Sequence, residues 1–235
     1  MANVYRRRRI VTIIISLVIL SIALIMNRPA PSVEPQVTRD QSYPGKVTGQ
    51  SAVEALKTLT IKGRAPKTDY SREQFGAGWE TLRGCDTRNI ILNRDLTNTQ
   101  VDDKCNVING TLNDPYTGKV IVFVRGSGTS GDVQIDHVVA LSDAWQKGAQ
   151  QLLKDKRIEL ANDHLELLAV DGPANQQKSD GDAATWLPLN KPFRCQYVSR
   201  QIAVKQKYSL WVTQPEYDAM DSVLQSCPQQ TLPKA

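Results

Sequence analysis

Histidine and cysteine are scarce in this sequence, which contains two histidines and four cysteines among 235 residues. Two histidines exclude a histidine-rich metal site. Four cysteines exclude a densely cross-linked disulfide scaffold but allow two bridges. The 14 glycines and 12 prolines are too few and too scattered for a low-complexity chain. With 40% hydrophobic and 23% charged residues, the composition is that of a globular protein.

The excess of positive charge belongs to one end of the chain. The formal net charge is +5, and residues 1–28 contain five arginines and no acidic residue. Residues 29–235 hold 24 basic and 24 acidic side chains, so they carry no net charge. Nucleic-acid binding by this part of the chain must therefore depend on local patches, because it has no global positive field.

The N-terminal segment has the pattern of an export signal. Arg6 to Arg9 precede an uncharged run from Ile10 to Met26, which is long for a signal-peptide core and short for a membrane span. We expect residues 1–28 to be a cytoplasmic arginine cluster with a transmembrane anchor over 10–26, or a cleaved signal peptide. Residues 29–50 are proline-rich and polar and read as a linker. Both alternatives place the domain at 51–235 on the extracellular face of the cell membrane or in the medium.

Export bears on the four cysteines, because cysteines outside the cytoplasm tend to pair. Three pairings are open to four cysteines. We favour Cys85 with Cys105 and Cys195 with Cys227, because each pair closes a local loop. A zinc site is the rival interpretation, and the lack of any C-x-x-C motif argues against it.

Several local signals place helices and strands in the exported part. Capping patterns at 51–54 and 213–216 predict helix starts. A continuous apolar run at 120–124 predicts a strand buried on both faces. Further strands are expected at 133–139 and 165–170, with a helix after Ser142 and another opened by Asp171-Gly-Pro173, before a helix at 192–211. These elements predict a mixed α+β domain.

One group of polar residues has complementary chemistry. His137 ends the strand beside Asp136, while Asn175 and Lys178 lie three residues apart at the start of a helix. Oxygen ligands from Asp136 and Asn175 suit a hard cation such as magnesium or manganese. A neutral imidazole at His137 can take a proton from water. Together these are the parts of a metal-assisted phosphodiester hydrolase.

The same residues sit in an ordered set of motifs. The set consists of G63-R-A-P-K-T-D-Y-S-R-E-Q-F75, C85-D-T-R-N-I-I-L-N-R-D95, D114-P-Y-T-G118, I135-D-H-V-V-A-L-S-D-A-W145, L167-L-A-V-D-G-P-A-N-Q-Q-K178 and A184-T-W-L-P188. It resembles the HNH, or ββα-metal, nuclease superfamily. More closely, it is similar to the nuclease domain shared by GmrSD-type restriction enzymes and exported actinobacterial HNH-family proteins. The resemblance extends from about residue 51 to Cys227.

The resemblance implies a ββα-metal core, with an inserted helix between its two strands and additional N- and C-terminal helices. It implies that Asp136 and Asn175 bind one divalent cation, Mg²⁺ or Mn²⁺, and that His137 is the general base. Lys178 would bind phosphate or stabilise the pentacovalent state. The expected substrate is nucleic acid, DNA more than RNA, cut without strong sequence specificity and without a small-molecule cofactor.

Glu166 departs from the family pattern, because it stands where the middle asparagine of the HNH motif is expected, nine residues before Asn175. An ionised carboxylate accepts hydrogen bonds but cannot donate them as an amide does. Glu166 could bind the metal or orient His137. It also leaves two alternatives open: a non-catalytic exported binding module with a weakened site, and a metal-dependent hydrolase of another phosphoester.

A basic stretch at 190–210 is the candidate nucleic-acid surface. It has five basic residues and no acidic one, with tyrosines interleaved. The expected contacts are Arg194, Arg200 and Lys205. A solvated helix face is the alternative interpretation.

Overall fold

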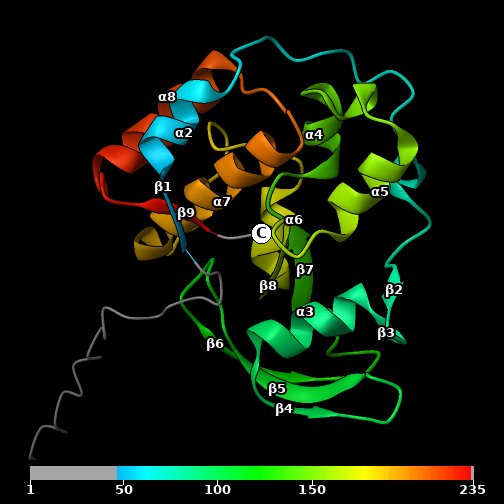
Figure 1. Cartoon of the computed structure of the whole chain (residues 1–235). Coiled ribbons are helices and arrows are strands. Elements are labelled where there is room, and N and C mark those ends of the chain that lie inside the picture. The colour runs from blue at the N-terminus through cyan, green and yellow to red at the C-terminus, as the bar shows by residue number, and fades with distance from the viewer. Residues whose placement is uncertain (1–46, 234–235) are drawn as a thin grey trace, which may run out of the picture. The chain divides into compact units, whose positions relative to one another are not determined.

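The computed structural model of the chain describes residues 47–233 (Figure 1). The anchor or signal peptide expected at residues 10–26 lies outside these residues. Within 47–233, no helix is both long enough and apolar enough to cross a membrane.

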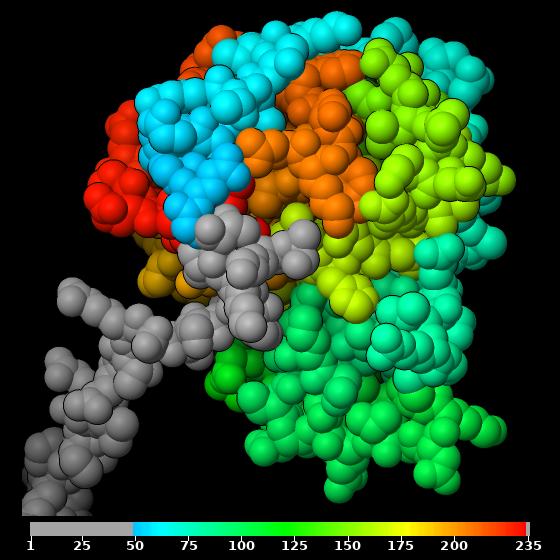
Figure 2. Space-filling view, in the orientation of Figure 1, coloured from blue at the N-terminus to red at the C-terminus, as the bar shows by residue number. Residues whose placement is uncertain are grey.

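The two ends of the described chain pack together. Strand β1 (Val47–Ser51) pairs antiparallel with β9 (Thr231–Pro233), and Figure 2 shows the blue and red segments side by side on one face. Helix α2 (Ala52–Thr58) follows β1 and contacts α7 (Arg194–Lys207) and α8 (Gln214–Gln225). The capping pattern at 213–216 is present as a reciprocal capping box, so this predicted helix start is confirmed.

A three-stranded antiparallel sheet with helix α3 (Thr87–Asp95) forms a second region (Figure 1). Its order is β4 (Thr97–Val101), β5 (Val107–Asn113) and β6 (Val120–Val124). The prediction that 120–124 is buried on both faces is wrong. Strand β6 lies at the edge of the sheet, where Phe123 faces the core and Val120, Val122 and Val124 face solvent. Alternate side chains of a strand point to opposite faces, and only one face of this sheet is covered.

The central element is an antiparallel pair followed by a helix. Strand β7 (Val133–His137) pairs with β8 (Leu167–Asp171), in a register that sets His137 opposite Leu167. Helix α6 (Gly172–Lys178) follows at once, capped by the Asp171 carboxylate, which accepts a hydrogen bond from the backbone N–H of Ala174 at 2.8 Å. This is the helix start that the sequence predicts.

The connection between β7 and β8 carries more helical structure than the single insertion expected. It contains α4 (Leu141–Gln146), the 3₁₀ turn η2 (Ala149–Gln151) and α5 (Lys154–Asn162). Two further 3₁₀ turns, η1 (Arg72–Phe75) and η3 (Lys191–Phe193), and the short hairpin β2 (Thr81–Leu82) to β3 (Cys85–Asp86) complete the described elements. Helices mixed with small antiparallel sheets agree with the predicted α+β class.

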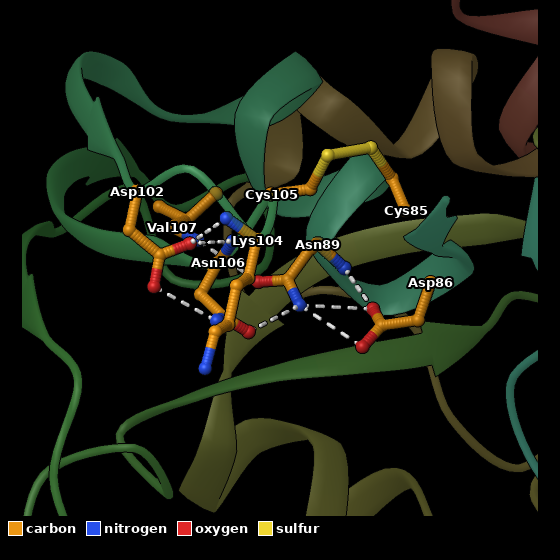
Figure 3. The surroundings of a disulfide bond; sticks show 8 residues. All are labelled: Cys85, Asp86, Asn89, Asp102, Lys104, Cys105, Asn106 and Val107. Carbon is orange, nitrogen blue, oxygen red and sulfur yellow. Dashed lines mark hydrogen bonds between the residues drawn. A yellow bond between two sulfur atoms is a disulfide. The ribbon is translucent and has the colours of Figure 1, made fainter. Parts of the chain in front are cut away.

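Both favoured disulfides are present, joining Cys85 to Cys105 and Cys195 to Cys227. The first ties strand β3 to the turn between β4 and β5 (Figure 3). Its surroundings are held by local hydrogen bonds: the Asp86 carboxylate accepts from the backbone N–H of Asn89 at 2.7 Å and so caps α3. This bridge therefore fixes the start of α3 against the sheet.

Candidate active site

Three of the predicted site residues line one cavity. His137 and Asp136 reach it from the end of β7, and Asn175 reaches it from α6. The cavity has a volume of about 660 Å³. The antiparallel pairing of β7 with β8 and the immediate turn into α6 bring these residues together, although 38 residues separate His137 from Asn175 in sequence.

The imidazole of His137 is held on two sides. Its ring stacks on Trp79, with centroids 5.6 Å apart and planes inclined by 9°. Its Nε2 lies 2.9 Å from the backbone oxygen of Ala161, at the end of α5. Because a carbonyl oxygen only accepts hydrogen bonds, this contact assigns the proton of the neutral ring to Nε2 and leaves a lone pair on Nδ1. Burial lowers the pKa of His137 to about 3, so the ring is neutral at physiological pH.

Asp136 is a buried carboxylate with a side-chain donor on each oxygen. Its Oδ1 accepts from Nζ of Lys178 at 2.9 Å, and its Oδ2 accepts from the Tyr116 hydroxyl. Burial raises the pKa of Asp136, while the Lys178 ammonium and the Tyr116 hydroxyl act in the opposite direction. An ionised carboxylate offers about four lone-pair positions, so both oxygens keep capacity for a further contact.

The ammonium of Lys178 is fully buried between β7 and α6. Besides Asp136, it donates to the backbone oxygen of His137 at 2.8 Å. Lys178 does not line the cavity that His137, Asp136 and Asn175 share. The geometry therefore gives Lys178 contacts that fix two neighbouring site residues, where the resemblance implied a contact with phosphate.

Asn175 has a defined orientation. Its Nδ2 donates to Oε1 of Gln134 at 2.9 Å, and Oδ1 has no hydrogen-bond partner among the described residues. A carboxylate and an amide oxygen at one polar cavity are the donors that a hard cation takes, with water completing its shell. The donor set of Asp136 and Asn175 therefore fits such an ion. Residues 47–233 contain no group of three or more His, Cys, Asp or Glu side chains that could hold a metal.

Glu166 is fully buried and lies against the loop that follows His137. Both carboxylate oxygens lie within reach of the backbone N–H of Val139, at 3.3 and 3.2 Å, and its own backbone oxygen accepts from Val138 at 2.9 Å. Burial raises the pKa of Glu166 well above its ordinary value. Glu166 does not line the cavity, so its position fits an orienting role and not metal ligation.

The basic surface expected on α7 needs correction. The guanidinium of Arg200 is buried and donates to the backbone oxygens of Leu165 and Leu167, each at 3.1 Å. The Lys205 ammonium is also buried, 2.9 Å from Oε1 of Glu216. Arg194 is half-buried and donates through Nε to the backbone oxygen of Pro188 at 2.7 Å. Arg200 and Lys205 make their contacts inside the protein, because other elements cover the middle of α7.

The cavity instead takes its positive charge from the segment before β4. Lys67, Arg72 and Arg88 line it, together with Trp79. The first three lie within the motifs that carry the family resemblance, although no role was predicted for Lys67 or Arg72. Trp79 lies outside those motifs, and no sequence signal pointed to it. The sequence therefore pointed to His137, Asp136 and Asn175, which share this cavity, but missed most of its basic residues.

Comparison with known proteins identifies relatives of this chain. Residues 86–223 match the family described as "GmrSD restriction endonucleases, C-terminal domain". An "Uncharacterized secreted protein" of Arthroderma benhamiae is 36% identical over 214 residues, which cover 90% of this chain and 98% of the relative. No solved structure matches the chain.

Proposed function

Because the chain belongs to the family of GmrSD restriction endonuclease C-terminal domains, we propose that it is a metal-dependent nuclease. It hydrolyses phosphodiester bonds of nucleic acid, DNA in preference to RNA, with low sequence specificity. The observation that carries this proposal is the neutral imidazole of His137, which shares one cavity with the oxygen donors of Asp136 and Asn175.

His137 acts as the general base. Its Nε2–H is engaged with the Ala161 carbonyl, so Nδ1 is the atom that takes a proton from the attacking water. The stacked indole of Trp79 and the Ala161 carbonyl fix the plane of the ring. A base whose position is fixed needs little reorganisation when the water loses its proton.

Asp136 and Asn175 are the residues that would hold the divalent ion. HNH-type nuclease domains generally use such an ion, and the oxygen donors favour magnesium or manganese. When bound, the ion supplies a Lewis acid that offsets charge developing on the phosphate. Tyr116 and Lys178 orient the Asp136 carboxylate, and Gln134 orients the Asn175 amide. Lys178 thus enters the proposal as a positioning residue.

Lys67, Arg72 and Arg88 supply the positive charge that attracts the phosphate backbone. Contacts to phosphate are the same for every base, which agrees with low sequence specificity. Two disulfides and a relative named as secreted support action outside the cytoplasm. Anchoring through residues 10–26 remains a prediction from the sequence.

The test uses the purified full chain with supercoiled plasmid and Mg²⁺ or Mn²⁺. We expect nicking that a chelator stops, and a loss of about a thousandfold in rate for His137→Ala. The matched control is His164→Ala, since His164 is exposed and does not line the cavity. No cleavage of DNA or RNA by the folded, disulfide-intact protein with either ion would contradict the proposal and favour the non-catalytic binding module. Cleavage of only other phosphoesters would favour the alternative hydrolase.

A further inference from the structure

A second, smaller cavity is also lined by His137. Its volume is about 200 Å³. It shares Arg72, Trp79, His137 and Leu141 with the larger cavity, so the two adjoin at the candidate catalytic residue. Nothing in the proposed hydrolysis uses this second space. A substrate group close to the cleaved bond is therefore within reach of this space while a phosphate lies in the larger cavity.

The walls of the smaller cavity are partly aromatic and apolar. Phe75, Trp79, Leu141 and Ala161 contribute these surfaces. Such walls accept a flat group that presents a π-face, and stacking on aromatic side chains tolerates every base. Arg72 lines both cavities, so the positive charge of the larger cavity extends to the edge of the smaller one.

One rim of the cavity is a loop with unused polar groups. The loop follows η1, and Gly76 and Gly78 in it have φ values of +105° and +142°. The backbone N–H groups of Ala77, Gly78 and Trp79 have no hydrogen-bond partner among the described residues. Free backbone donors beside apolar walls match a ligand with flat apolar faces and a polar edge.

We propose that this cavity binds the base of the nucleotide next to the cleaved phosphate. The inference rests on the nuclease function proposed above and adds a substrate class to it: single-stranded or unpaired nucleic acid. A base in a duplex is stacked on both faces and paired along its edge, so it must leave the helix to enter a cavity. An unpaired base enters without that cost, and the chain therefore prefers it.

Binding tests the subsite separately from catalysis. The full chain, in a chelator, is titrated with thymidine 5′-monophosphate and with 2-deoxyribose 5-phosphate, which lacks the base. We expect the nucleotide to bind about tenfold more tightly. Ala77→Trp places a large side chain in the cavity and should reduce the difference to less than about twofold. Leu153→Trp, at an exposed position outside both cavities, should retain it.

Cleavage tests the substrate class. The wild type should have a kcat/KM about tenfold higher for a single-stranded oligonucleotide than for the same sequence in a duplex. Ala77→Trp should remove this preference and leave hydrolysis of methyl p-nitrophenyl phosphate, an ester without a base, within about twofold of wild type. If circular dichroism shows that Ala77→Trp is unfolded, Ala77→Leu takes its place.

The outcomes separate the two proposals. Equal binding of the nucleotide and the base-free phosphate by the wild type overturns the subsite, whatever the catalytic result. Equal losses on the oligonucleotide and the base-free ester also overturn it, because Ala77→Trp would then obstruct the catalytic cavity in general. Base-dependent binding without any cleavage supports the subsite and contradicts the nuclease function.

Discussion

Among the described residues, two groups of largely buried charged side chains differ in what they leave available to a ligand. The first is the candidate site around Asp136 and Lys178. The second, which we call the ionic cluster, joins α4, α7, α8 and two loops. Its members are Arg64, Asp143, Lys147, Asp182, Lys205 and Glu216.

Every charge of the ionic cluster lies near an opposite charge of the same cluster. Lys147 lies 2.8, 2.7 and 2.6 Å from oxygens of Asp143, Asp182 and Glu216, and Arg64 lies 2.9 and 2.7 Å from the first two. Three carboxylates and three cations balance in charge. In the candidate site, by contrast, Oδ1 of Asn175 has no partner among the described residues. Burial of charge is therefore common to both groups, and an amide oxygen that lies beside a cavity without a partner in the described chain distinguishes the candidate site.

The same substitution in each group is the sharpest test of this contrast. Asp136→Asn should lower kcat/KM about a thousandfold, because it removes the charged oxygen ligand of the proposed metal. Asp182→Asn should leave kcat/KM within about threefold and lower the free energy of unfolding by about 1–3 kcal/mol. Plasmid cleavage measures kcat/KM of both variants, and urea denaturation measures their free energy of unfolding. Comparable losses of kcat/KM in the two variants would show that the two groups do not differ in their role in catalysis.

Removal of the central cation should show how strongly the ionic cluster holds the fold. Lys147→Met leaves three buried carboxylates with too few cations, and we expect a loss of about 3–5 kcal/mol in the free energy of unfolding. The exposed Lys154→Met serves as control. An unchanged urea midpoint in Lys147→Met would mean that the cluster adds nothing to stability.

The two disulfides extend the comparison to covalent links. The pairs Cys85→Ser with Cys105→Ser, and Cys195→Ser with Cys227→Ser, should each cost about 2–4 kcal/mol of stability. Only the first pair should also lower kcat/KM of the folded protein, by about tenfold. Its bridge fixes the hairpin between Trp79 and Arg88, which both line the larger cavity. Activity assays well below the melting temperature separate the two effects, and equal activities would refute this link.

The smallest expected effect concerns Glu166. Its pKa is raised in the folded state, so between about pH 4.5 and that pKa the native protein binds more protons than the unfolded chain. The stability that protonated Glu166 contributes is fully present below the unfolded pKa. It is lost as pH rises through the folded pKa. Glu166→Gln does not titrate, so it should be about as stable as wild type at pH 4 and more stable than wild type at pH 8. Urea denaturation at both pH values measures this, with exposed Glu80→Gln as control. A difference that does not change with pH would show that Glu166 ionises normally.

Short-range patterns in the sequence determined much of this protein. The cap at Asp171 and the capping box at 213–216 set helix starts, because their hydrogen bonds span only three residues. Asp136 and His137 are neighbours, and Asn175 follows β8 directly, so a strand pair and a turn suffice to bring them to one cavity. Each disulfide likewise closes a short loop, with its two cysteines 20 or 32 residues apart.

Tertiary structure alone decided which surfaces are covered. It exposed three valines of β6, buried Arg200 and Lys205, turned Lys178 onto Asp136, and brought Trp79 and Tyr116 to the candidate site. Each of these depends on contacts between segments far apart in the chain. A residue's own type does not reveal whether another element will cover it, because the free energy of burial depends on the partner that packs against it.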